Sequence, residues 1–312
     1  VGDRLYNHVK YRFKYKDQMY FNITGEKDAG EQFWGKHNRL YDFWSASFQM
    51  KNIGKIKNLI IGDYQVNFGQ GLVISQAFKT GKSAMTTNIC DMNAGFKRYG
   101  SNNEFNYLRG IATTIQLNKI QLSTYYSYDK KDGNGEDDEI TGFYQTGYHR
   151  TITEISKKNC ITQQLLGCNL TYQDKWFKLG ISSLYMFLDK PLQPKPAPYN
   201  LFYFAGKQQW VNGLDYRFAV FGEIGNVDWQ HTAWVNGVTY APISRVNLAV
   251  LYRYYPPEYN AFYAHSFAES SASRNESGLY IGAEVQPIKN VKLSCYADNY
   301  RFPWLRYGVD AP

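Results

Sequence analysis

The sequence predicts an all-β protein, and three observations carry this prediction. Of 312 residues, 17% are aromatic, with 28 Tyr, and 26 residues are Gly, a composition rich in Tyr for a soluble α/β protein. Apolar and polar residues alternate repeatedly, which is the period-2 pattern of a strand with two unlike faces. The mean hydropathy is −0.51. No apolar run approaches the roughly 18 residues of a transmembrane helix, so that class is excluded.

Alternating segments follow one another along the chain. In the first, Val9, Tyr11 and Phe13 lie on one parity and Lys10 and Arg12 lie on the other. Six further segments of this kind are 120–128, 177–187, 214–220, 246–254, 279–285 and 291–297.

Residues 105–117 alternate less regularly. Arg109 falls on the parity of Phe105 and Tyr107, where an apolar residue is expected. A β-bulge at Gly110 would restore the alternation, so we expect one there.

The connections between these segments differ systematically in length. Short turns are expected at 16–18, 52–55, 118–119, 173–175, 241–244 and 286–290. Long stretches with weak alternation are 67–104, 129–162, 189–212 and 256–277. Short periplasmic turns opposite long outer loops are typical of outer-membrane barrels. The sequence therefore predicts an antiparallel transmembrane β-barrel of the outer-membrane type.

A soluble all-β sandwich or propeller is the alternative, since alternation also occurs there. No blade-length repeat is visible, and the connections are long for a sandwich. We expect residues 1–312 to form a single barrel domain, in which 67–104 is a candidate lumen-folded loop. A barrel must close its edges, and no final strand ends on a terminal aromatic residue. We therefore expect an incomplete excerpt of a larger barrel.

The polar parity of the strands indicates which charges would face the lumen if the apolar parity faces lipid. The whole chain carries a formal net charge of +8. The basic lumen positions are Lys10, Arg12, Lys14, Lys178, Arg217, Arg245, Arg253 and Lys292, and the acidic ones are Asp215, Glu223, Glu284 and Asp298. Eight positive less four negative charges leave +4. Charge of one sign biases permeation, so we predict a cationic lumen that prefers anions, either small solutes or a phosphate backbone.

Signals for catalysis, metal binding or a cofactor are weak. The five histidines show no metal-ligand spacing, and no Gly-x-Ser-x-Gly nucleophile motif occurs. Gly81-Lys82-Ser83 resembles the end of a phosphate-binding loop, but Gln76 stands where that loop needs glycine. The carboxylates of 129–139 do not fit a calcium-binding EF-hand loop. We therefore expect no catalytic residues, no metal, no cofactor and no enzymatic activity.

Several stretches resemble a family of Bacteroidetes outer-membrane proteins labelled helix-hairpin-helix domain-containing proteins. The matching residues are Gly62–Gly71, Gly81–Ala84, Gly147–Thr151 with Glu154, and Arg301–Tyr307 with Val309–Pro312. The resemblance implies a large β-barrel that follows a periplasmic region with helix-hairpin-helix units. No such unit is recognisable in this chain.

Two functions are compatible with these observations. The first is an outer-membrane pore, alone or as part of a translocating assembly, with outer-membrane lipid, lipopolysaccharide and other outer-membrane or periplasmic subunits as partners. The alternative is a plugged structural or binding barrel that anchors a periplasmic helix-hairpin-helix domain, with nucleic acid as a partner of that domain. Both place the protein in the bacterial outer membrane.

Overall fold

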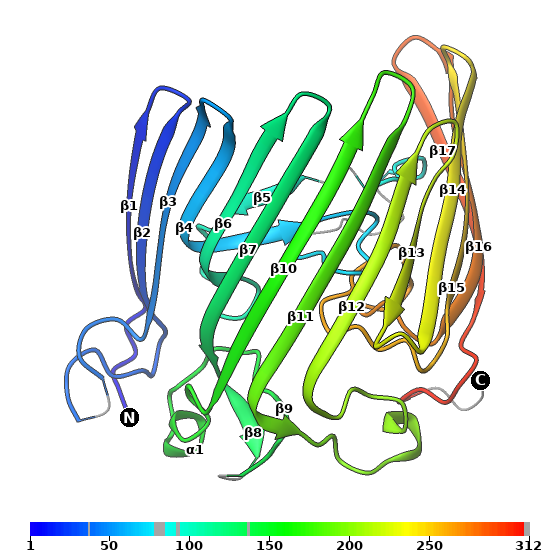
Figure 1. The fold of residues 1–312 in the computed structure, drawn as a ribbon. Helices are drawn as coiled ribbons and strands as arrows, with labels where there is room; N and C mark the ends of the chain where they lie inside the picture. The colour runs from blue at the N-terminus through cyan, green and yellow to red at the C-terminus, as the bar shows by residue number, and fades with distance from the viewer. Residues whose placement is uncertain (37, 78–84, 92–93, 136–137, 309–312) are drawn as a thin grey trace.

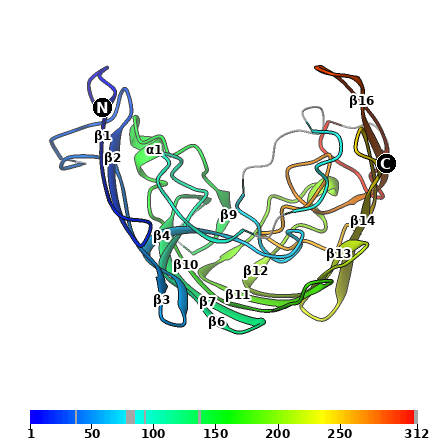
Figure 2. The ribbon, with the colours of Figure 1, turned by 90° about the horizontal axis from the view of Figure 1, so that it is seen from above.

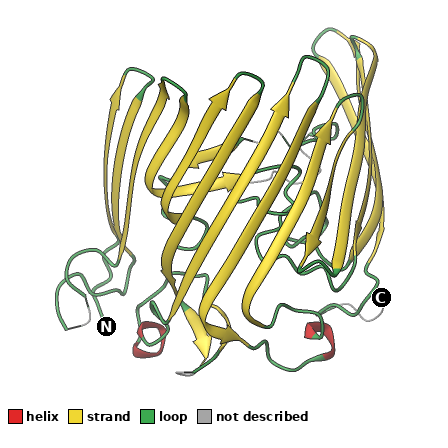
Figure 3. Ribbon diagram, in the orientation of Figure 1, coloured by secondary structure: helices red, strands yellow, loops and turns green. Residues whose placement is uncertain are grey.

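The computed structural model describes residues 1–312 except 37, 78–84, 92–93, 136–137 and 309–312, and its regular structure is almost entirely β-strand (Figures 1 and 3). Fourteen of the 17 strands form one antiparallel wall in chain order. The wall strands are β1 (Asn7–Tyr15), β2 (Met19–Lys27), β3 (Phe43–Ile53), β4 (Ile56–Asn67), β6 (Leu108–Leu117), β7 (Ile120–Lys131), β10 (Ile161–Gln173), β11 (Lys178–Leu192), β12 (Gly206–Arg217), β13 (Phe221–Val227), β14 (His231–Ile243), β15 (Val246–Tyr255), β16 (Glu276–Ile288) and β17 (Val291–Arg301).

The remaining elements are short. They are β5 (Gly95–Arg98), β8 (Gly133–Gly135), β9 (Ile140–Phe143), α1 (Ile152–Ile155) and the 3₁₀ turn η1 (Pro198–Asn200). In the described part of the chain, no helix is long and apolar enough to span a membrane.

Seen from above, the wall curves around a concave inner side (Figure 2). Within the described residues, β1 pairs only with β2, and β17 pairs only with β16. The wall therefore forms an arc with two unpaired edges.

The outer face of the wall is apolar and the inner face is largely polar. On β10, for example, Leu166 and Leu170 are exposed, whereas Gln163, Asn169 and Thr171 are buried on the concave side. Soluble proteins show the opposite arrangement, because water favours polar side chains outside. The exposure pattern and the antiparallel register confirm the predicted all-β fold class, an outer-membrane-type barrel wall.

The connections follow the predicted length asymmetry. Two-to-four-residue turns lie at the upper end of Figure 1, while both termini and the long connections β2–β3, β7–β10 and β11–β12 lie at the lower end. Asn118 and Asn290 in two of these turns have φ of 53° and 70°, a left-handed conformation that Asn tolerates. One connection departs from the pattern, because the turn at 228–230 between β13 and β14 is short and lies at the lower end.

A pair of glycines marks the place where β4 leaves the wall. Gly62 has φ +98° and faces Gly110 of β6, which has φ +155°. A Cβ on Gly62 would lie 2.2 Å from the carbonyl oxygen of Ala46, so only glycine fits. Beyond Gly62, the strand turns inward and pairs with β5 as well (Figure 1).

The expected bulge at Gly110 is not formed against β4, because that pairing continues through Gly110 to Leu108 without a shift in register. The pairing of β6 with β7 ends at Gly110, which faces Ser127. The irregular position of Arg109 has another cause: its guanidinium binds the buried carboxylate of Asp63 at 2.7 Å. An ion pair thus accounts for a charge on the apolar parity.

Two connections fold back onto the concave side of the wall. Residues 68–76, which we call the lumen segment, are all buried. Residues 256–275, within the stretch 256–277 expected as an outer loop, pack against this segment, and Tyr259 donates to the Leu72 carbonyl at 2.9 Å. Apolar side chains such as Tyr259, Leu72 and Val73 are fully buried in this packing, which explains why the connection turns inward.

Glu223 of β13 holds the lumen segment against the wall. Its carboxylate accepts hydrogen bonds from the backbone N–H of Gln70 at 2.6 Å, Leu72 at 3.0 Å and Val73 at 3.4 Å. Of the expected lumen loop 67–104, residues 78–84 and 92–93, including Gly81–Ala84, lie outside the described residues. The described lumen segment fills the concave side next to β12 and β13.

Candidate functional site

A large cavity lies between β1–β2 and the inward-turned part of β4 with β5. Its volume is about 930 Å³. Four of its lining residues are basic, namely Arg12, Lys14, Lys97 and Arg98, and none of the described residues that line it is Asp or Glu. We refer to it as the basic cavity.

Two basic side chains of β1, Arg12 and Lys14, line this cavity, and both are exposed. Lys10, Arg12 and Lys14 share one parity, opposite to the exposed Tyr11 and Phe13. Lys10 donates to the carbonyl of Gly100 on the inner segment that follows β5. Lys14 pairs with Asp17 in the adjoining turn at 2.7 Å. Arg12 makes no hydrogen bond or ion pair to any described residue.

Three cationic side chains lie over the ring of Tyr20 on β2. The guanidinium of Arg98 lies 4.3 Å from the centre of the Tyr20 ring, and Lys14 and Lys51 lie at 5.6 and 5.7 Å. Arg98 also donates to Gln49 at 3.1 Å. The aromatic ring stabilises these cations without neutralising them, so Arg98 keeps its charge, whereas that of Lys14 is offset by Asp17.

Lys51, Lys97 and Arg98 are site residues that the sequence analysis missed. Lys97 and Arg98 lie on β5, a strand of 4 residues, too short for a recognisable alternation. A weak signal exists, because both follow Gly95, a glycine with φ +66° at the start of the strand.

The charged residues predicted for the lumen on the other side of the arc are placed differently. Arg253 is fully buried and binds Glu276 at 2.5 Å and both oxygens of Asp298 at 2.9 and 3.0 Å. Lys292 pairs with Glu284 at 2.7 Å. Two cations thus face three carboxylates within the wall, so these residues add no net positive charge to the interior.

The remaining predicted positions lie toward the upper end of the wall. Asp215 and Glu223 face each other across β12 and β13, and Arg217 and Lys178 face each other across β12 and β11. Arg245 lies in the exposed turn between β14 and β15. Of the predicted basic positions, the structure brings Lys10, Arg12 and Lys14 together in or beside the basic cavity.

A second cluster of titratable groups, also missed by the sequence analysis, lies at the end of the long connections. His149 contacts carboxylates through both ring nitrogens, with Nδ1 2.5 Å from Asp42 and Nε2 2.8 Å from Asp132. Glu31 accepts the backbone N–H of His149 at 2.8 Å. Burial opposes the charge of the imidazole, but the hydrogen bonds to Asp132 and Asp42 raise the pKa of His149 to about 9.

This cluster also contains the residues best able to hold a metal ion. Ligand atoms of Glu31, Asp42 and His149 lie within 4.8 Å of one another. However, Lys158 binds the second oxygen of Asp42 at 2.6 Å, and both nitrogens of His149 are engaged by carboxylates. An imidazolium and an ammonium group thus place two positive charges against the three carboxylates of this cluster, where a metal ion would otherwise supply positive charge.

Comparison with known proteins gives distant structural likenesses only. No protein-family model matches the sequence, and no curated protein matches it. A mutant porin from Rh. blastica matches with a TM-score of 0.38 and 13% identity, over 94% of this chain and 83% of that one. Salmonella typhi OmpF in complex with daunomycin matches with a TM-score of 0.42 and 9% identity, over 95% and 83%. Because these TM-scores are below 0.5, the fold assignment rests on register and exposure and not on these likenesses.

Proposed function

We propose that this chain is part of an outer-membrane β-barrel in which the basic cavity forms an anion-selective passage. The observation that carries the proposal is the basic cavity itself, with four cationic side chains and no carboxylate among its described lining residues. Charge of one sign between low-dielectric walls concentrates ions of the opposite sign.

The outer face of the wall supports an outer-membrane location. Leu166, Leu170 and Ile181 are exposed there, on strands long enough to cross the hydrocarbon core. In this proposal the short turns face the periplasm and the long connections face outward, as in other barrels of this type. Outer-membrane lipid and lipopolysaccharide are then its immediate partners, and no catalytic role is included.

A plugged, structural barrel is the second candidate. It is supported by the lumen segment, which occupies the concave side beside β13 and is bound by Glu223. In the pore proposal, the passage runs beside this segment through the basic cavity. In the plugged barrel, no continuous passage exists.

Single-channel recording of the full-length protein in planar bilayers tests the proposal. Under a salt gradient, the reversal potential is expected to show anion preference, and Arg12→Glu with Arg98→Glu is expected to abolish or reverse it. Lys195→Glu, in the long connection between β11 and β12 and away from the cavity, is the matched control and should change nothing. Cation selectivity of the unmodified protein would refute the anion passage, and the absence of conductance would support the plugged barrel.

A further inference from the structure

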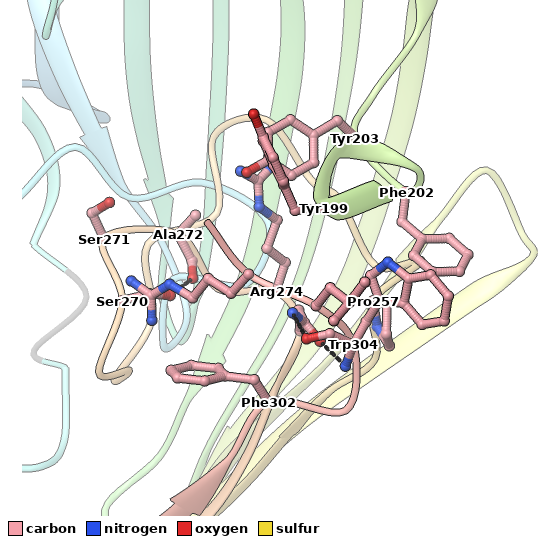
Figure 4. Close-up of a pocket in the computed structure, with 13 residues that line it drawn as sticks. Tyr199, Phe202, Tyr203, Pro257, Ser270, Ser271, Ala272, Arg274, Phe302 and Trp304 are labelled. Carbon is pink, nitrogen blue, oxygen red and sulfur yellow. Dashed lines mark hydrogen bonds between the residues drawn. The ribbon is translucent and has the colours of Figure 1, made fainter. Parts of the chain in front are cut away.

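Three separate segments meet at the lower end of the wall and enclose a second pocket (Figure 4). They are the connection containing η1, the 256–275 connection, and the residues that follow β17. The pocket has a volume of about 190 Å³, roughly that of six water molecules. It is separate from the basic cavity, and neither Arg274 nor Arg306, its two basic residues, belongs to the passage proposed above.

Both arginines are held by aromatic rings and not by carboxylates. The guanidinium of Arg274 lies 3.7 Å from the centre of the Tyr203 ring, and that of Arg306 lies 4.5 Å from the centre of the Phe302 ring. No ion pair joins either arginine to a described carboxylate. Arg274 donates one hydrogen bond, to Asn260 at 2.9 Å. Since a guanidinium has five N–H donors, most donors of both groups remain free for a ligand.

The two positive charges are close enough to affect each other. Burial lowers the pKa of Arg274, and the charge of Arg306 lowers it further. Two like charges at the rim of one cavity repel each other. An anion bound there would relieve this repulsion.

The surrounding residues fix the shape of the pocket. Asn275 and Trp304 exchange two hydrogen bonds, at 2.8 and 2.9 Å, and the Trp304 indole donates to the carbonyl of Pro198 at 2.9 Å. Phe202 packs edge-on against Trp304 at 5.2 Å. These contacts link all three segments before any ligand arrives. Such preorganisation lowers the cost of binding.

We propose that this pocket binds an oxyanion, a phosphate or a carboxylate, clamped between Arg274 and Arg306. Planar guanidinium groups match oxyanions in geometry and form charge-assisted, bidentate hydrogen bonds with them. The small volume selects a compact occupant. A phosphorylated sugar supplies this chemistry either as a free solute or as part of a lipopolysaccharide headgroup.

Calorimetric titration of the full-length protein in detergent tests the proposal, with glucose 1-phosphate as the probe and neutral glucose for comparison. The phosphate ester is expected to bind and glucose is not. Arg274→Gln and Arg306→Gln should each weaken binding at least tenfold, because each removes charge-assisted hydrogen bonds. The matched control is Arg150→Gln at the same end of the wall, where Arg150 lies 4.0 Å from the Tyr148 ring but is ion-paired with Glu154 at 3.0 Å. Its titration should equal that of the unmodified protein.

A second arm identifies the source of the oxyanion. Binding of vesicles that contain lipopolysaccharide is compared with binding of vesicles that contain dephosphorylated lipopolysaccharide. If vesicle binding depends on the phosphate and on both arginines, and glucose 1-phosphate does not bind, then the ligand is a lipid headgroup. If neither probe binds, or if both glutamine variants bind like the unmodified protein, the clamp is refuted. Should Arg274→Gln fail to fold, Arg306→Gln alone decides, because Arg306 is exposed at the rim.

Discussion

The hydrogen bonds of Glu223 predict how firmly the lumen segment is held. Glu223→Met keeps the length of the side chain and removes both acceptor oxygens. The N–H groups of Gln70 and Leu72, bound at 2.6 and 3.0 Å, would then be buried without partners. At about 1.5 kcal/mol for each unsatisfied N–H, the bound state of the segment loses about 3 kcal/mol.

Hydrogen exchange measures this loss directly. A change of about 3 kcal/mol in opening free energy corresponds to amide exchange on the order of 100-fold faster at Gln70 and Leu72. The hydroxyl of Tyr259 still binds the Leu72 carbonyl in the variant, so the segment should loosen without leaving the wall. Glu284→Met is the control, since that carboxylate pairs with Lys292 and does not contact the segment. Unchanged exchange in Glu223→Met would show that apolar packing alone retains the segment, and the reasoning would be wrong.

Three further predictions concern the long connections, the kink in β4 and the orientation of the wall. Because its pKa in the folded protein is about 9 and its ordinary value is 6.5, His149 contributes stability that is fully present below pH 6.5 and is lost as the pH rises through 9. Limited proteolysis of the surrounding connection should therefore accelerate between pH 7 and pH 10 (roughly the span of this transition), and His149→Gln should remove that dependence. Gly62→Ala should destabilise the fold by about 1–3 kcal/mol in urea unfolding, because its φ is +98° and a backbone oxygen lies 2.2 Å from the new Cβ; Gly142→Ala, which meets nothing within 4 Å, should have little effect. In a background without the native cysteines, an impermeant maleimide on intact cells should label Asn134→Cys and not Lys175→Cys; the reverse result would invert the orientation.

The wall could be predicted from the sequence because each strand carries its own signal. On β1 and β10, apolar residues on one parity meet lipid and polar residues on the other meet the interior, independently of any distant contact. Lys10, Arg12 and Lys14 share the polar parity of β1; Arg12 and Lys14 line the basic cavity, and Lys10 contacts its inner segment.

The interior could not be predicted in this way, because its contacts join residues far apart in the chain. Asp42 lies 107 residues from His149, and Glu223 lies 151 residues from Leu72. No local pattern signals such pairs.

The uneven distribution of charge has a consequence for the direction in which a solute travels. Arg12 of β1 and Lys97 and Arg98 of β5 have no carboxylate partner among the described residues, whereas on β15, β16 and β17 Arg253 binds two carboxylates and Lys292 binds one. The electrostatic potential therefore falls across the interior, perpendicular to the strands as well as along them. In the passage proposed above, a dipolar solute would turn its negative end toward β1 before it advances. Its path would run off-centre, along one side of the arc, and molecules of equal size and charge would be separated by the position of that charge.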